Sequence, residues 1–463
     1  MAGIAGMNRA GEQEQVARML GKITHRGQAG SKVLESHGVT LGAVWPETQA
    51  VQTPPTLRQQ AAWDGHRPPL PEPAALRRRR EPFALAAATR HGLFLARDLL
   101  GVRPLYYGCT PDGALCFASE VKALLEVTRD VQEFPPGSWY NSHNGFAPFS
   151  TVQRRPPPSQ DTDDIAHGLL LHLEQAVCQR IHSTELGCWL SGGLDSSVIA
   201  ALARPHVQKL HTFAAGLPGA PDLEFAQQVA DFVGAAHHQV VLSLDDLLAA
   251  LPKVIYHLES FDALLVRSSV TNYLVSRRAA EYVGAVFSGE GADELFAGYS
   301  YMKQLDADQI AAELVDSTHR LHNTALQRVD RSASAHGLVA FLPFLDPEVV
   351  EYALAIPTAL KLRREGAVVE KWILRYALID RLPDAVLWRR KAKFWQGAGV
   401  GDLLAQYADE RIDDDAFRRE RALPGGAMLN TKEELLYYRI FREHFGPLAD
   451  LSWVGRTQGA PKN

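Results

Sequence analysis

The sequence predicts an α/β protein with a β-rich N-terminal domain, a parallel doubly wound α/β domain and a helical C-terminal part. Up to about residue 155, short β-like runs are divided by Pro- and Gly-rich turns, which is typical of a β-rich domain. From about residue 161 to 300, strand-like segments alternate with helical segments, and this alternation predicts a parallel sheet. From about residue 301 the pattern is mostly helical, and the prolines of Arg154 to Gln160 predict a linker.

The expected elements follow from apolar runs and their spacing. In the N-terminal part the β-like runs are 33–34, 38–44, 83–88, 93–97, 105–108 and 114–118. The alternating part predicts helix 163–182, strand 186–190, helix 196–204, strand 209–216, helix 222–234, strand 238–242, helices 244–283 and strand 284–288. The expected domains are therefore 1–155 and 161–463.

Composition excludes several classes of protein. The chain has 463 residues, of which 46% are hydrophobic, so it can bury sizeable cores, and its net charge of −5 argues against a nucleic-acid surface. Its four cysteines show no Cys-x-x-Cys spacing and no signal peptide precedes them, so we expect reduced thiols in the cytoplasm. No apolar run approaches the roughly 18 residues of a membrane span. We therefore expect a soluble protein without nucleic-acid or membrane partners.

The first candidate binding loop is Ser191 to Ser197. It follows an apolar run that ends at Leu190, and it opens a helical pattern from Val198. A strand, a Gly-rich turn and a helix N-terminus can bind a phosphate, because free N–H groups and the positive dipole end face the anion. The serines add hydroxyl donors, and Asp195 is a hard oxygen ligand suited to Mg²⁺. The spacing fits neither the Walker A motif nor the dinucleotide fingerprint, and alone it is equally compatible with a tight turn.

A second loop of similar build, Ser288 to Glu294, follows the apolar run Val283 to Phe287. It is rich in glycine and contains three acidic residues, which favours a metal or acid–base site. The alternative is a solvated turn before the next helix, which is expected at Leu295 to Tyr299. Because ligands of open α/β sheets bind at the carboxyl ends of strands, the two loops together predict a nucleotide site.

Motifs along nearly the whole chain resemble the glutamine-dependent asparagine synthetase family. That family joins a class II glutamine amidotransferase domain of the Ntn type to a PP-loop synthetase domain. Besides the two loops, the motifs are Met1-Ala2-Gly3-Ile4, His25-Arg26-Gly27, Leu95 to Tyr107, Ala118 to Leu125, Pro343-Phe344-Leu345-Asp346, Glu370 to Arg375 and Trp388 to Lys391. The resemblance implies a truncated amidotransferase-like domain at 1–155 and a PP-loop ATP pyrophosphatase domain at 161–463.

The resemblance also implies an activity, an ATP-dependent carbon–nitrogen ligase that uses ATP and Mg²⁺. A substrate carboxylate becomes an acyl-adenylate with loss of pyrophosphate, and an amine then displaces AMP. Glu290 and Lys391 match the catalytic residues, as the base for ammonia and the cation at the α-phosphate. Asp195 and Asp293 match the metal ligands. The residues that match the nucleotide site are Leu190, Ser191, Gly193, Asp195, Ser196, Ser197, Ala215, Ser288 and Gly289, with Leu190, Ala215 and Ser288 at the adenine.

Three departures from the family pattern bear on the reaction. Where family amidotransferases carry the cysteine nucleophile, this chain has Ala2, whose methyl group cannot form a thioester. Between Thr53 and Pro82 the glutamine-binding segments of the family are missing, which predicts a degenerate domain without glutaminase activity. Val339 and Phe341 replace the usual Glu-x-Arg pair, a change compatible with repacking or with an acyl substrate other than aspartate.

Three functions therefore remain open. The first is an amide synthetase that uses free ammonia, with aspartate or a close analogue as acyl donor. The second is an amide ligase of the β-lactam synthetase, carbapenam synthetase or lasso cyclase type, which uses a substrate amine. Because the β-lactam-forming members carry Tyr at the position of Glu290, the glutamate favours ammonia. The third is a non-catalytic regulator. The expected partners are a small carboxylate substrate and ammonia. The sequence leaves open whether the chain forms a homodimer and whether a separate protein supplies the ammonia.

Overall fold

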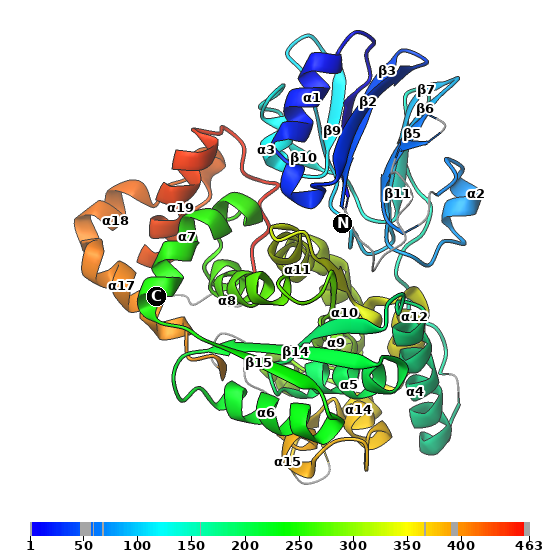
Figure 1. The fold of residues 1–463 in the computed structure, drawn as a ribbon, viewed down its shortest axis with the longest axis vertical. Coiled ribbons are helices and arrows are strands. Elements are labelled where there is room, and N and C mark those ends of the chain that lie inside the picture. The colour runs from blue at the N-terminus through cyan, green and yellow to red at the C-terminus, as the bar shows by residue number, and fades with distance from the viewer. Residues whose placement is uncertain are drawn as a thin grey trace.

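The computed structural model describes residues 2–46, 57–58, 60–66, 69–157, 159–364, 367–389 and 397–457. At one end of the molecule, two six-stranded antiparallel sheets lie face to face (Figure 1). The first sheet contains β1 (Gly3–Met7), β2 (Gly30–Ser36), β3 (Val39–Trp45), β8 (Tyr106–Cys109), β9 (Leu115–Ala118) and β10 (Gln132–Glu133). The second contains β4 (Leu57–Arg58), β5 (Ala61–Asp64), β6 (Ala84–Thr89), β7 (Gly92–Arg97), β11 (Ser138–Asn141) and β12 (Gly145–Pro148).

Strand β3 is buried on both faces, which explains why its sequence is apolar apart from Thr40. Alternate residues of a strand point to opposite faces of the sheet. Leu41 and Ala43 belong to the core between the two sheets, together with Leu95 of β7. On the other face, a Cβ at Gly42 would lie 2.8 Å from the Leu20 side chain of α1 (Gln13–Gly21). The first sheet is thus covered by the second sheet on one face and by α1 on the other.

The rest of the chain is built on a five-stranded parallel sheet. Its order is β15-β14-β13-β16-β17, formed by β15 (Ala236–Val241), β14 (Lys209–Gly216), β13 (Glu185–Trp189), β16 (Ala285–Phe287) and β17 (Val339–Phe341). The chain forms β13, β14 and β15 in turn toward one edge of the sheet, and then returns to form β16 and β17 toward the other edge. The neighbouring strands β13 and β16 therefore mark the topological switch point. Figure 1 shows α5 and α6 on one face of the sheet and α7 and α8 on the other. The predicted doubly wound α/β class is confirmed.

Helices make up most of the remaining structure. The helices of the N-terminal part besides α1 are the short α2 (Pro73–Leu76) and α3 (Val121–Leu124). Those around the parallel sheet are α4 (Thr162–Cys178), α5 (Leu194–Ala203), α6 (Pro221–Val233), α7 (Leu244–Leu258), α8 (Ala263–Ala279), α9 (Ala292–Leu295), α10 (Ala307–His319) and α11 (Ala325–Ser334). They are followed by α12 (Pro347–Ala355), α13 (Thr358–Lys361), α14 (Trp372–Ala377), α15 (Asp384–Leu387), α17 (Gly401–Arg411), α18 (Asp414–Glu420) and α19 (Lys432–Phe445). Within the described ranges, every helix is too short or too polar to cross a membrane.

Local sequence explains where several helices begin. The Asp161 carboxylate accepts hydrogen bonds from the backbone N–H groups of Asp163 and Asp164 and so caps α4. Ser243 and Asp246 form a reciprocal capping box at α7. Helix α6 ends in a different way. The residue that follows it, Gly234, adopts a φ of 66°, a left-handed conformation that favours glycine and terminates the helix.

The structure corrects two expectations about local elements. The helix expected at Leu295 to Tyr299 instead begins at Ala292, because Gly291 turns the chain with φ of 99° and its carbonyl accepts from the Leu295 N–H. The stretch after residue 301 also contains β17, which the helical pattern did not predict. This strand has three residues, and it is defined by its pairing with β16 rather than by its own sequence.

Candidate active site

Two loops follow the neighbouring strands β13 and β16, at the carboxyl edge of the parallel sheet. The first loop, Ser191 to Ser197, includes the first turn of α5, and the second loop, Ser288 to Glu294, continues into the short helix α9. A Cβ on Gly289 would lie 2.6 Å from the backbone nitrogen of Ser196, closer than real Cβ contacts. Glycine at 289 therefore lets the two loops touch, and this contact brings their carboxylates to one place.

Lys371 joins the two aspartates that were predicted to bind a metal ion. Its Nζ lies 2.6 Å from both carboxylate oxygens of Asp195 and 2.6 Å from Oδ1 of Asp293. The lysine side chain is 3% exposed, whereas those of Asp195 and Asp293 are 21% and 16% exposed. Two carboxylates from different loops thus share one buried ammonium, and both remain partly open to solvent.

The donor set fits Mg²⁺ bound together with a phosphate. Within the described part of the chain, no group of three or more His, Cys, Asp or Glu side chains is arranged to hold a metal ion. Mg²⁺ is commonly held by one or two carboxylates plus substrate phosphate oxygens and water, and Asp195 and Asp293 supply two carboxylates. The site is therefore suited to a metal ion that arrives with a polyphosphate.

The hydroxyl groups of the first loop hold its conformation. The Ser196 Oγ accepts from the Ser191 N–H at 3.1 Å, and the Gly193 N–H donates to the Ser191 Oγ at 3.3 Å. Ser197 is fully buried and its Oγ donates to the Gly193 carbonyl at 2.7 Å. Of the three predicted serines in this loop, Ser191 is half-buried, whereas Ser196 and Ser197 are buried. Its hydroxyl is therefore the most accessible of the three to an anion.

The acidic residues of the second loop lie in two different environments. Glu290 is 17% exposed and forms an ion pair with Arg328 of α11. Glu294 is buried and accepts a hydrogen bond from the Tyr299 hydroxyl. Burial, together with the nearby charges of Asp293 and Glu290, raises the pKa of Glu294 to about 7. Glu290 is thus the accessible carboxylate of this loop that is not joined to Lys371, whereas Glu294 is partly protonated near neutral pH.

The residues predicted to contact adenine lie along the same sheet edge. Leu190 follows β13, Ala215 is near the end of β14 and Ser288 follows β16, and all three are buried. The Leu190 N–H donates to the Phe213 carbonyl, and the Ser288 N–H donates to the Phe341 carbonyl, so backbone bonds extend the sheet beyond its strands. Lys391, the predicted catalytic lysine, lies outside the described residues.

Sequence reasoning missed the roles of Lys371 and Arg328 in the geometry of the site. Lys371 belongs to the motif Glu370 to Arg375, but no local pattern places it near Asp293 and Asp195, which lie 78 and 176 residues earlier in the chain. Its own turn is held by its neighbours, because Arg375 binds Glu370 at 3.1 Å. Lys371 adopts φ of 55°, which is uncommon outside glycine and is concentrated at functional positions. This backbone conformation is visible only in the structure.

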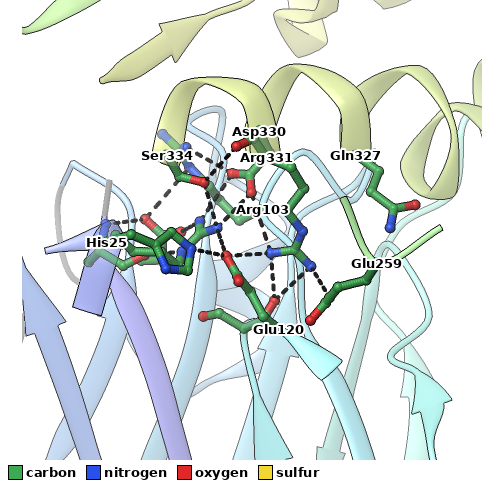
Figure 2. Close-up of polar contacts among 12 residues, drawn as sticks. His25, Arg103, Glu120, Glu259, Gln327, Asp330, Arg331 and Ser334 are labelled. Carbon is green, nitrogen blue, oxygen red and sulfur yellow. Dashed lines mark hydrogen bonds and ion pairs between the residues drawn. The ribbon is translucent and has the colours of Figure 1, made fainter. Parts of the chain in front are cut away.

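At the position of the family's cysteine nucleophile, Ala2 is buried against charged side chains. Its N–H donates to Oδ1 of Asp64 at 3.1 Å, and its carbonyl accepts from Nε of Arg26 at 2.8 Å. Its methyl group supplies no nucleophile. The residues around it instead form part of a buried ion-pair network that continues into α11 (Figure 2).

Comparison with known proteins assigns the family. The asparagine synthase family model matches residues 168–311 and 303–459, and the glutamine amidotransferase domain model matches residues 75–146. Glutamine-hydrolyzing asparagine synthetase B of Escherichia coli strain K12 is 36% identical over 386 residues, covering 78% of this chain and 69% of that protein. Glutamine-hydrolyzing asparagine synthetase 2 of Arabidopsis thaliana is 35% identical over 390 residues, covering 78% of this chain and 66% of that protein.

A probable glutamine-hydrolyzing asparagine synthetase of Schizosaccharomyces pombe is 37% identical over 412 residues, covering 80% of this chain and 73% of that protein. The chain thus spans about two thirds of the length of these curated relatives. The family match covers more than half of the chain and includes both loops of the site. The chain belongs to the asparagine synthase family.

Proposed function

We propose that this chain is an ATP-dependent amide ligase. It adenylates the side-chain carboxylate of aspartate or a close analogue and aminates the product with free ammonia. The observation that carries the proposal is the group formed by Asp195, Asp293 and Lys371, with contacts of 2.6 Å at the switch point of the sheet. Membership of the asparagine synthase family supports the same reaction class.

In the first half-reaction a carboxylate oxygen attacks the α-phosphorus of ATP. The new bond joins that oxygen to phosphorus, and the bond from the α-phosphorus to the pyrophosphate oxygen breaks. Asp195 and Asp293 would hold Mg²⁺, which neutralises charge on the departing pyrophosphate. Lys371 adds a cation beside both carboxylates, and the Gly193 and Ser191 loop offers donors at a helix N-terminus.

In the second half-reaction the nitrogen of ammonia attacks the acyl carbon. A carbon–nitrogen bond forms, the bond to the AMP oxygen breaks, and a proton leaves the nitrogen. Glu290 is the candidate acceptor of that proton, because it is accessible and lies on the second loop, which touches the first loop, where ATP would bind. The role of Lys391 as the cation at the α-phosphate of ATP stays a prediction.

The nitrogen comes from free ammonia in this proposal rather than from glutamine. Ala2 stands where a nucleophilic cysteine is needed, and the ion pairs around Arg26 fill the space beside it. We therefore expect that glutamine does not replace ammonium, unless a separate glutaminase supplies ammonia.

One observation favours a second candidate, a ligase whose acyl substrate is not aspartate, such as one that carries its own amine nucleophile. Phe341 ends β17, where the family has an arginine, and its ring packs at 5.7 Å from that of Phe287. An apolar ring at this edge removes a cation that could pair with a substrate carboxylate. The acyl substrate would then differ from aspartate.

The test is pyrophosphate release with ATP, Mg²⁺ and a panel of carboxylates, each with ammonium, with glutamine, or with neither. Turnover with aspartate and ammonium, but not with glutamine, is the expected result. Turnover of another amino-carboxylate without ammonium would support the amine ligase instead. Absence of pyrophosphate release across the panel, with a folded protein, would contradict both.

A further inference from the structure

Helix α11 lies between the N-terminal sheets and the parallel-sheet region (Figure 1). It is almost entirely buried, and it contacts α8, α7 and β17. The Gln327 side chain donates to the Leu258 carbonyl at the end of α7 at 2.6 Å. Three charged residues of this one helix, Arg328, Asp330 and Arg331, reach both parts of the molecule.

Asp330 binds a buried arginine of the N-terminal part. The Arg26 guanidinium is fully buried and contacts both oxygens of Asp330, at 2.7 and 3.1 Å. The same guanidinium lies 3.0 Å from Asp64 and 2.9 Å from Glu120. A bidentate arginine–carboxylate contact fixes orientation as well as distance. Figure 2 shows Asp330 on the side of the helix that faces the N-terminal sheets.

Arg331 makes the second contact across the boundary. It lies 2.8 Å from Glu120 and 3.1 Å from Glu259, and it also donates to the Ser119 carbonyl. Glu259 in turn accepts from the backbone N–H groups of Val121 and Lys122, where α3 begins. We call Arg26, Asp64, Glu120, Glu259, Asp330 and Arg331 the junction network. Its members are buried, so each charge depends on the others for compensation.

Arg328 lies on the same helix, two residues before Asp330. It forms an ion pair with Glu290, the carboxylate that accepts the proton of ammonia in the proposed function. A helix turns about 100° per residue and is stiff over ten residues, so a shift of Asp330 also moves Arg328. The junction network and the second loop of the site are thus connected through a single rigid element.

We propose that Arg328 is a positioning residue for Glu290, and that the N-terminal part sets the place of Arg328 through the contact of Arg26 with Asp330. This inference rests on the proposed function. It gives the N-terminal sheets a role in amide formation that does not depend on hydrolysis of glutamine. Adenylation uses Asp195, Asp293 and Lys371, and the ion pairs of α11 do not include these residues. A change in α11 should therefore affect amide formation without affecting adenylation.

The predicted consequence is uncoupling. When Glu290 is not held in place, ammonia is not deprotonated at the acyl carbon, and water hydrolyses the acyl-adenylate instead. Pyrophosphate is then still released, but less amide is formed for each pyrophosphate. A general loss of folding would lower both products together, so the ratio of pyrophosphate to amide identifies the positioning role.

The experiment compares Arg328→Gln, Arg328→Lys and the control Arg320→Gln in the full chain. Arg320 is a nearby arginine whose partners are Glu313 and Asp316 and which does not bind Glu290. For Arg328→Gln we expect amide formation to fall about 100-fold, within the range of general-base effects. Carboxylate-dependent ATP–pyrophosphate exchange should change less than about threefold, because the effect belongs to the later step. Arg328→Lys should recover part of the amide, and Arg320→Gln should match the wild type.

The link to the N-terminal part is tested with Asp330→Asn and Arg26→Lys, after thermal unfolding has shown which variants fold. A folded variant should raise the ratio of pyrophosphate to amide, and its combination with Arg328→Gln should be less than additive. An unchanged ratio in the folded junction variants would overturn the link. Equal loss of exchange and amide in Arg328→Gln would overturn the positioning role. Wild-type protein without either half-reaction would instead contradict the proposed function.

Discussion

Lys371 sets the electrostatic balance of the candidate site. Its ammonium is the cation that the described residues place between Asp195 and Asp293, with contacts of 2.6 Å to each. Removing one partner of a buried ion pair leaves charge without compensation. The aspartates and the lysine therefore have to be understood as one group, whose function depends on all three side chains.

Lys371→Met should lower carboxylate-dependent ATP–pyrophosphate exchange by about 100-fold or more, because the developing charge of the pyrophosphate loses a fixed cation. The two aspartates should then repel each other in the absence of Mg²⁺, so addition of Mg²⁺ should raise the melting temperature more than in the wild type. Lys22→Met, which removes a surface partner of Glu126, is the matched control. Exchange at the wild-type rate in Lys371→Met would refute the role of the ammonium.

Glu294 predicts a pH dependence of stability. Its pKa rises from 4.5 in the unfolded chain to about 7 in the fold, mainly through burial. The folded state therefore binds more protons than the unfolded state between these values, so the stabilising contribution is fully present below pH 4.5 and is lost as the pH rises toward 7. Glu294→Gln removes this loss and should be more stable than the wild type at pH 8, by on the order of 3 kcal/mol.

Thermal or urea unfolding of the wild type and of Glu294→Gln, measured from pH 4 to pH 8, checks this expectation. The two curves of stability against pH should diverge as the pH increases. Parallel curves would show that Glu294 is ionised in the fold at the same pH as in the unfolded chain.

At the scale of the elements, the contact between the two loops defines the site. Gly289 is the point of closest approach, where an added Cβ would meet the backbone of Asp195 and Ser196 at 2.6–2.9 Å. Backbone cannot move aside as a flexible side chain can, so any substitution separates the loops. The glycine thereby controls the distance between the carboxylates of Asp195 and Asp293, which follow different strands.

Gly289→Ala should reduce ATP–pyrophosphate exchange by about tenfold or more and destabilise the fold by about 1–3 kcal/mol, the usual cost of overpacking. Gly21→Ala is the matched control, because a Cβ at that helical position meets no atom within 4 Å and alanine favours a helix. The control should be as stable as the wild type or more stable. If Gly289→Ala keeps full exchange activity, the close contact of the loops is not needed for binding.

At the scale of the whole molecule, the junction network joins the N-terminal sheets to the rest of the chain. Arg26→Met removes the guanidinium that binds Asp64, Glu120 and Asp330 and leaves these buried carboxylates without their shared partner. We expect a loss of about 3–5 kcal/mol in the free energy of unfolding, as for other broken buried pairs. Differential scanning calorimetry should resolve the weakened junction as two transitions in place of one.

The control for this variant is Arg155→Met. Arg155 pairs with Glu351 at 2.7 Å, but both side chains are largely exposed, so the change should cost less than about 1 kcal/mol. A similar loss of stability in both variants would show that the buried network contributes no more than a surface pair.

The sequence by itself determined the fold class, the two strands at the switch point, β13 and β16, and the two loops that follow them. These features depend on residues close together in the chain, such as the apolar run before Ser191 and the glycines that allow each turn. Strand 209–216 agrees with β14 at both ends, since its pattern is continuous and buried. The departures at Ala2 and Phe341 are also visible without a structure.

Only the tertiary structure decided which distant side chains meet. Lys371 reaches Asp293 across 78 positions and Asp195 across 176. Arg328 reaches Glu290, and Arg26 reaches Asp330 across 304 positions. Strand β17 likewise exists because β16 offers an edge on which it can pair. Such contacts depend on how the sheets and helices pack, and the free energy of a buried ion pair depends on the surroundings of both partners. Local sequence patterns carry no information on those surroundings, so the site's charge balance follows from the packing.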